Sequence, residues 1–149
     1  MQNAHAHSGM EIIPRAECLR LLATQPVGRL GFVVGDQPMV LPVNFATQGD
    51  VVVFRTGEGS KLPAAQPTKV AFEVDDVGPG RGWSVVVQGV AEEITDIDDW
   101  FVEVLRRRAP LTWVPGAADH YVRIQPSMIS GRRLPSTSAP TSDPPTPAG

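Results

Sequence analysis

Residues 27–56 read VGRLGFVVGDQPMVLPVNFATQGDVVVFRT, and this stretch decides the fold class. It holds three runs rich in β-branched and other apolar residues, Val27–Val34, Met39–Ala46 and Val51–Thr56. The connections between them, residues 35–38 and 48–50, each contain a Gly-Asp pair, which is typical of hairpin turns. We therefore expect the three runs to be antiparallel neighbours in one sheet.

Strand and helix patterns continue on both sides of this stretch. Further strands are expected at Val70–Asp75, Trp83–Ile94 and Tyr121–Ile129. Short helices are expected between Pro14 and Pro26, at Ser60–Gln66 and at Asp96–Arg108. The last of these segments begins with aspartates and ends with arginines, which complements the helix dipole. A series of short antiparallel strands with helices at the connections predicts a mainly β chain, a small β-barrel with short α-helices.

The composition predicts one folded domain with a tail at each end. The chain has 149 residues, of which 42% are hydrophobic and 19% are charged, as is typical of a globular protein. Residues 1–10 are polar, and residues 135–149 consist mainly of Pro, Ser, Thr, Ala and Gly, so neither end can form a core. We expect disordered tails at 1–10 and 135–149 and a folded domain at 11–134.

Charge and hydrophobic patterning argue against several classes of function. A net charge of −3 disfavours nonspecific binding to nucleic acid or anionic membranes. The sole cysteine, Cys18, cannot form an intrachain disulfide, and no Cys/His cluster has zinc spacing. No apolar run approaches the ~18 residues of a membrane span, and the first residues lack a signal-peptide pattern. We expect a cytoplasmic protein without a nucleic-acid or membrane partner.

Residues 54–62, FRTGEGSKL, carry the strongest indication of a binding site. The predicted strand ends at Thr56, and two glycines then let the backbone approach a ligand closely. Ser60 is a good helix N-cap, and the free amides of a helix N-terminus bind anions. Arg55 and Lys61 add positive charge suited to phosphate oxygens. Taken alone, the segment is equally typical of a solvated glycine loop with an ordinary capping serine.

The neighbouring motifs indicate which phosphate ligand is meant. Five motifs occur in order: Gly28-Arg29-Leu30, Pro42-Val43-Asn44-Phe45, the Arg55–Leu62 loop, Phe72-Glu73-Val74-Asp75 and Gly82–Gly89. The ordered set resembles the pyridoxamine 5′-phosphate oxidase-like family, above all its small actinobacterial members and its nitroimidazole-resistance-like branch. The resemblance covers about residues 11–134. It implies a six-stranded antiparallel Greek-key split barrel of the FMN-binding type.

The resemblance also implies a homodimer with two FMN molecules at the subunit interface. The strand expected along the isoalloxazine ring, largely through its backbone, holds Val40, Leu41, Pro42, Val43 and Asn44. The residues expected to hold the ribityl phosphate are Arg55, Thr56, Ser60 and Lys61. Ser84 falls where the oxidases carry a polar flavin-contacting residue, and Trp83 beside it is expected to stack near the ring or at the dimer interface.

By the same resemblance, the chain is expected to be an FMN-dependent oxidoreductase acting on a small molecule. Pyridoxamine phosphate is not the expected substrate, because Ser60-Lys61 replaces the Arg-Lys pair of the true oxidases and the C-terminal stretch differs. The alternatives are a deazaflavin-dependent reductase on the same fold, a non-enzymatic flavin- or haem-binding protein, and a barrel that binds no cofactor tightly. The roles of His120, Arg132 and Arg133 stay open between ligand contacts and ordinary surface positions.

Overall fold

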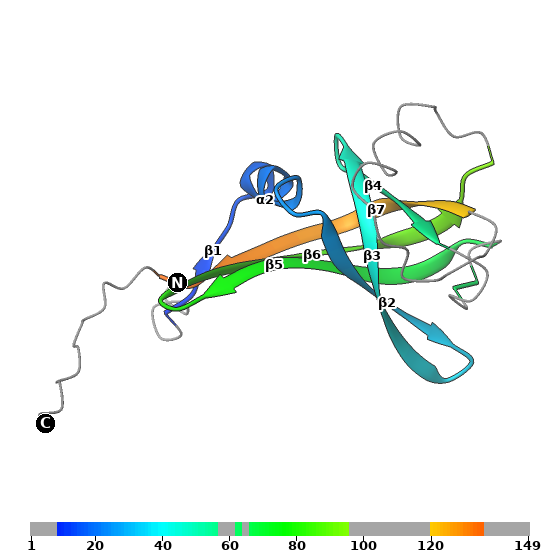
Figure 1. Cartoon of the computed structure of the whole chain (residues 1–149), viewed down its shortest axis with the longest axis horizontal. Coiled ribbons are helices and arrows are strands. Elements are labelled where there is room, and N and C mark those ends of the chain that lie inside the picture. Colours follow the sequence, from blue (N-terminus) through cyan, green and yellow to red (C-terminus); the bar gives the residue numbers. More distant parts are fainter. Residues whose placement is uncertain (1–8, 57–61, 64–65, 96–119, 136–149) are drawn as a thin grey trace, which may run out of the picture.

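The computed structural model describes residues 9–56, 62–63, 66–95 and 120–135, and its order of elements is shown in Figure 1. One helix and seven strands are assigned in these ranges: β1 (Glu11–Ile12), α2 (Arg15–Leu22), β2 (Val27–Val34), β3 (Gln37–Gln48), β4 (Val51–Thr56), β5 (Thr68–Gly78), β6 (Arg81–Glu93) and β7 (His120–Arg133). The helices expected at Ser60–Gln66 and Asp96–Arg108 lie wholly or mostly outside the described residues, as do most of the two tails.

All strand pairs are antiparallel, and the sheet closes on itself. The strand order is β1-β7-β4-β3-β2-β5-β6, with an additional pairing between β7 and β6. Strands β2 to β7 therefore form a six-stranded closed barrel, as expected for the split-barrel fold. The expected strand count was one too low, because the two-residue β1 pairs with Arg132 and Arg133 at the end of β7. Such a short pairing depends on a partner about 120 residues away and has no local pattern of its own.

Three phenylalanines anchor the interior of the barrel. Phe45, Phe54 and Phe72 are fully buried, and the rings of Phe45 and Phe72 meet edge to face with centroids 4.9 Å apart. Gly28 on β2 makes room for the Phe72 ring, because a Cβ there would lie 2.3 Å from Cζ of Phe72. The glycine in the first motif thus allows β2 to pack closely over the Phe72 ring.

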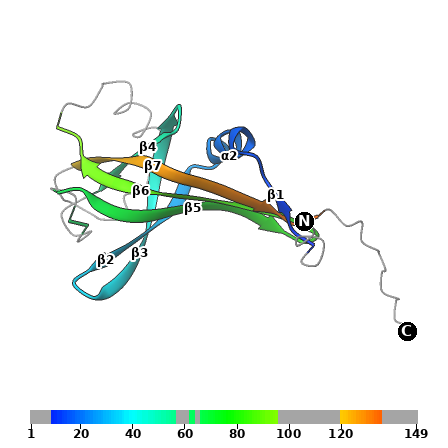
Figure 2. The same ribbon diagram turned by 180° about the vertical axis from the view of Figure 1, so that it is seen from behind.

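Strands β5, β6 and β7 run side by side along the length of the molecule, and the β2–β3 hairpin projects from them (Figures 1 and 2). Helix α2 follows Pro14 and turns Cys18, Leu21 and Leu22 toward the core. Gly131 on β7 lets the helix approach, since a Cβ there would lie 2.7 Å from Sγ of Cys18. In the described ranges, no helix has the length and apolar character needed to cross a membrane.

Candidate functional site

The β3 segment expected along the flavin ring alternates between core and surface. Leu41 and Val43 face inward, the latter with only 4% of its surface exposed. Val40, Pro42 and Asn44 therefore project outward, and Val40 is 69% exposed. Only the backbone of the two inward residues can reach a ligand on the outer side, which is how the resemblance expects this strand to contact the ring.

Arg55 and Thr56 end strand β4 and are brought to the same place as the start of β7. Arg55 pairs with Tyr121, and Thr56 pairs with His120. Consecutive strand residues project to opposite faces, so the two side chains do not converge directly. Arg55 shares the outer side with Asn44, because these residues flank the inward-facing Phe45–Phe54 pair on neighbouring strands. Ser60 and Lys61, the other expected phosphate contacts, lie outside the described residues.

The outer side of β3 and β4 fits the two chemical parts of a flavin nucleotide. An open apolar surface at Val40 and Pro42 suits the flat ring, and the Asn44 amide follows one alternate position further along the strand. The Arg55 guanidinium lies at the end where the phosphate is expected, and it matches a phosphate in charge and geometry. Four of the expected contact residues therefore lie along one continuous surface: Val40, Pro42, Asn44 and Arg55.

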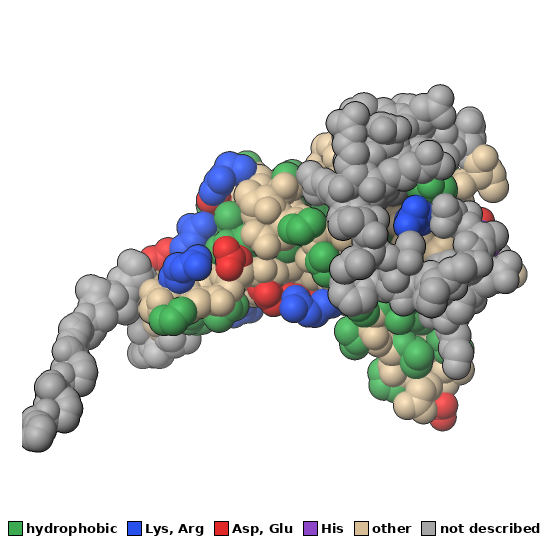
Figure 3. All heavy atoms as spheres, in the orientation of Figure 1, with side chains coloured by type: hydrophobic (Ala, Val, Ile, Leu, Met, Phe, Trp, Pro, Cys, Tyr) green, Lys and Arg blue, Asp and Glu red, His purple; other side chains and the backbone are tan. Residues whose placement is uncertain are grey.

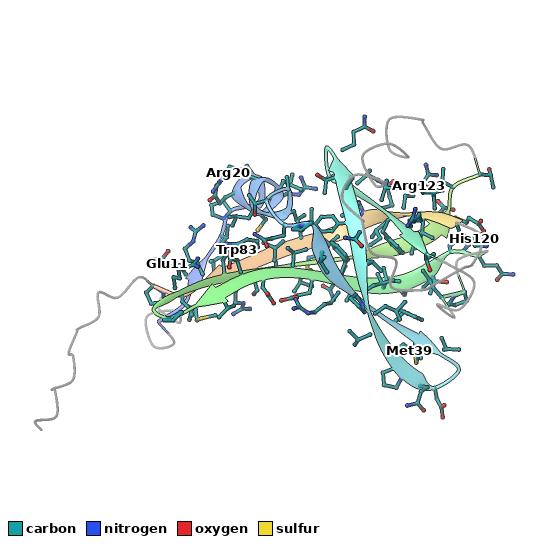
Figure 4. The ribbon with its side chains drawn as sticks, in the orientation of Figure 1. Glu11, Arg20, Met39, Trp83, His120 and Arg123 are labelled. Atoms are coloured by element: carbon teal, nitrogen blue, oxygen red, sulfur yellow. The ribbon has the colours of Figure 1, made fainter. Side chains whose placement is uncertain are left out.

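Ser84 and Trp83 lie far from that surface within a single chain. Strand β6 carries both residues, and β3 and β6 are three strands apart in either direction around the closed barrel. Figure 4 shows Trp83 and His120 toward opposite ends of the long sheet, and His120 marks the Thr56 end. Trp83 is half-buried against the core, whereas Ser84 faces outward between Asp75 and Arg132. One chain cannot bring Ser84 and the β3 surface to the same ligand.

A charged trio on the barrel surface adjoins the β3 strand. Nη1 of Arg29 on β2 donates to Oε1 of Glu73 and Oδ2 of Asp75 on β5, each over 3.3 Å. Arg29 also stands directly opposite Pro42 in the β2–β3 register, so the trio is one strand away from the expected ring surface. Phe72 and Val74 are fully buried, so the alternating Glu73 and Asp75 occupy the outward, polar face of the strand.

The two carboxyl groups of this trio do not both ionise readily. The pKa of Glu73 is raised from its ordinary value of 4.5 to about 7. Partial burial is the largest cause, followed by the hydrogen bond with Asp75 and the repulsion of its charge, while Arg29 acts in the opposite direction. At neutral pH a proton is therefore held at the pair in a large fraction of molecules.

His120 is paired at the mouth of the barrel. Its Nδ1 lies 2.7 Å from Oε2 of Glu93 at the end of β6, and both side chains are about one-third exposed. A carboxylate in this position orients an imidazole ring, so His120 presents a defined edge beside Thr56. Among the residues described, no group of three or more His, Cys, Asp or Glu side chains is arranged to hold a metal ion.

The two C-terminal arginines differ in environment. Nη2 of Arg133 lies 3.2 Å from Oε2 of Glu17 on α2, and Arg20 binds the same carboxylate. These contacts lower the pKa of Glu17 to about 2, with the Arg20 hydrogen bond as the largest cause. The Arg133–Glu17 ion pair thus links helix α2 to β7. Arg132 is exposed on the outer face beside Ser84, at the far end from Thr56.

Sequence reasoning missed the Arg29–Glu73–Asp75 trio and the His120–Glu93 pair. The two-residue period of a strand is enough to put Glu73 and Asp75 on one face, but the cation that pairs with them comes from β2, 44 residues before Glu73. His120 and Glu93 are separated by 27 residues and meet only through the β6–β7 pairing. No spacing rule in one sequence reports such a cross-strand neighbour.

Known proteins resemble this chain over most of its length. The sequence profile of the family described as pyridoxamine 5′-phosphate oxidase matches residues 14–133. An uncharacterised Mycobacterium tuberculosis protein, Rv0080, is 35% identical over 144 residues, covering 89% of this chain and 92% of that one. An FAD-binding protein from Mycobacterium smegmatis is 34% identical with a TM-score of 0.64, and one from Mesorhizobium loti is 30% identical with a TM-score of 0.72. Both structures match over 83% of this chain and 97% of their own.

Proposed function

Since this chain belongs to the pyridoxamine 5′-phosphate oxidase family, we propose that it binds a flavin nucleotide and uses it as an oxidoreductase on a small molecule. The observation that carries the proposal is the continuous outer surface from Val40 and Pro42 to Arg55. A bound flavin supplies hydride and electron transfer, while the protein supplies position, electrostatics and exclusion of water. The altered loop and C-terminal stretch favour a substrate other than pyridoxamine phosphate.

Each part of the surface has a distinct role in this proposal. Val40 and Pro42 pack against the ring, and the backbone of Leu41 and Val43 contacts its polar edge. The Arg55 guanidinium neutralises the phosphate as a planar donor. Ser60 and Lys61 are expected to complete the phosphate site from the following loop. Thr56 contributes through its backbone, because its side chain projects to the face opposite that of Arg55.

The proposed cofactor site is shared by two copies of the chain. Strands β3 and β6 lie three strands apart in either direction, so one copy cannot bring both to a single flavin. In a two-fold symmetric dimer, the β3 surface of one copy can face Ser84 of the other. This arrangement supports a homodimer with a flavin in each of two equivalent interface sites.

The form of the flavin distinguishes two versions of the proposal. The sequence resemblance favours FMN, whereas two similar solved structures are FAD-binding proteins. Both cofactors carry the same ring and the same ribityl phosphate, so the Val40–Arg55 surface serves either one. Titration of the full chain with FAD, FMN and a deazaflavin, followed by absorbance and fluorescence, shows which of the three cofactors the chain binds. If neither FAD nor FMN binds at micromolar concentration, the proposed function is wrong.

Lys61→Ala is expected to weaken flavin binding by about 1.5–3 kcal/mol, which is the range for a hydrogen bond to a charged group. This loss corresponds to a dissociation constant raised roughly ten- to hundredfold. Isothermal titration calorimetry of the variant and the parent measures it. The matched control is Lys69→Ala, which removes an exposed lysine from β5 and should leave the affinity unchanged. Equal affinity of Lys61→Ala and parent would remove Lys61 from the phosphate site.

A further inference from the structure

The charged trio lies on an open and partly apolar part of the barrel surface. Next to Arg29 and Glu73, the adjoining row of outward positions is Val40, Gly31 and Ala71, as the strand registers show. Val40 is 69% exposed, and Val33 further along β2 is 54% exposed. Figure 3 shows hydrophobic side chains gathered over the projecting β2–β3 hairpin. We call this surface, formed by Arg29, Val33, Val40, Ala71, Glu73 and Asp75, the β2–β3–β5 face.

The charges of this face do not balance when both acids are ionised. Arg29 contributes one positive charge against the two negative charges of Glu73 and Asp75. From β6, the residues opposite the two acids are Val86 and Ser84, which carry no charge. Two further charges on this side are exposed Lys69, four residues before Glu73 on β5, and Arg132, beyond Ser84 on β7. When both acids are ionised, each copy therefore presents one carboxylate that Arg29 does not neutralise.

An isologous contact would bring two such clusters into one interface. The same patch then occurs on both partners, so two net negative clusters lose water together and repel each other. One proton per cluster removes both the cost of desolvating a net negative charge and the repulsion between the clusters, because Arg29 then faces a single carboxylate and a neutral acid. Partial burial already makes the Glu73 carboxyl hold its proton near neutral pH, with a pKa of about 7, and further burial raises that pKa.

We propose that self-association of this chain through the β2–β3–β5 face is coupled to proton uptake at the Glu73–Asp75 pair. The partner is a second copy of the chain, so the inference rests on the dimer of the proposed function. The coupling has a fixed sign. Association is favoured below the pKa of the free chain and weakens as the pH rises through about 7. The cofactor site at the interface would then assemble more readily in mildly acidic than in alkaline solution.

The test is sedimentation equilibrium of the full chain at pH 6.0 and pH 8.5 and equal ionic strength. Uptake of one proton per copy predicts a dimer dissociation constant at least ~10-fold larger at the higher pH. Glu73→Gln replaces the acid with a neutral side chain of the same shape. It should associate at both pH values as the parent does at pH 6.0. Asp75→Asn leaves Arg29 facing the Glu73 carboxylate alone, so the charges balance without a proton and this variant should also associate at both pH values as the parent does at pH 6.0.

The matched control is Glu92→Gln on β6, whose carboxylate also pairs across strands with an arginine, Arg123, over 3.4 Å. This variant should keep the parent's pH dependence. A parent dimer equally stable at both pH values, or a Glu73→Gln variant with the parent's pH dependence, would overturn the coupling and leave the cofactor proposal standing. A chain that stays monomeric at both pH values would overturn the coupling and the proposed dimer together.

Discussion

Replacing Phe72 by alanine should lower the free energy of unfolding by about 3–5 kcal/mol, the range for removing a fully buried aromatic side chain. Phe72 is 0% exposed, meets the Phe45 ring at 4.9 Å, and fills the space that Gly28 leaves open. Alanine would leave a cavity at the contact between β2 and β5, because the closed barrel limits how far these strands can collapse. Urea denaturation followed by tryptophan fluorescence measures the loss.

Val77→Ala is the matched control for this prediction, since it truncates a side chain on the same strand. Val77 is 67% exposed, so its removal should change the free energy of unfolding by no more than about 0.5 kcal/mol. Similar losses in the two variants would contradict the assignment of Phe72 to the core. So would a loss of less than about 1 kcal/mol for Phe72→Ala, because a cavity of that size cannot close without cost.

Gly89→Ala is the second substitution with a large expected effect, a loss of about 3 kcal/mol or more from overpacking against backbone. A Cβ at this position would lie 2.2 Å from the carbonyl oxygen and 2.9 Å from the carbonyl carbon of Gln125. Gly89 also adjoins the irregularity in the β6–β7 register, where the pairing shifts between Gln88 and Gly89. Backbone atoms cannot rotate away as a side chain can, so the added methyl group must displace β7 and its hydrogen bonds. Thermal denaturation by circular dichroism is a suitable measurement.

The control for Gly89→Ala is Gly78→Ala at the end of β5. The atoms nearest to a Cβ there belong to the Arg81 guanidinium group, at 3.3–3.5 Å, and this exposed side chain can shift where backbone cannot. The control should therefore stay within about 1 kcal/mol of the parent, as expected for a surface substitution. If Gly89→Ala is as stable as Gly78→Ala, the close approach of β6 and β7 at this position is wrong.

The local sequence pattern predicted both bounds of two strands correctly. The bounds of β2 and β4 agree with the expected Val27–Val34 and Val51–Thr56. Both runs are rich in apolar residues, and the glycine turns at Gly35 and Gly49 mark the end of β2 and the start of β4. Strand β7 was expected to end at Ile129 but continues to Arg133. Its last residues are polar or small and have weak strand preference. They are held by pairing with β6 and β1, which the sequence does not show.

The candidate site likewise combines residues whose placement the sequence predicts with residues that only the strand pairing brings together. The outward set on β3 follows from the two-residue period of a strand, so Val40, Pro42 and Asn44 could be predicted from sequence. The same period separates the side chains of Arg55 and Thr56, which a reading of the loop as one cluster overlooked. The trio around Arg29 needed the β2–β5 register.

The sequence by itself determined the mainly β fold, the alternation that builds the core, and the order of motifs that identifies the family. Those features depend on neighbours within a few residues, where strand period and turn chemistry act directly. The tertiary structure alone decided that Glu73 meets Arg29, that His120 meets Glu93, and that Ser84 lies across the barrel from β3. Barrel closure joins residues far apart in the chain, and the resulting proximity sets which charges interact and which carboxyl keeps its proton.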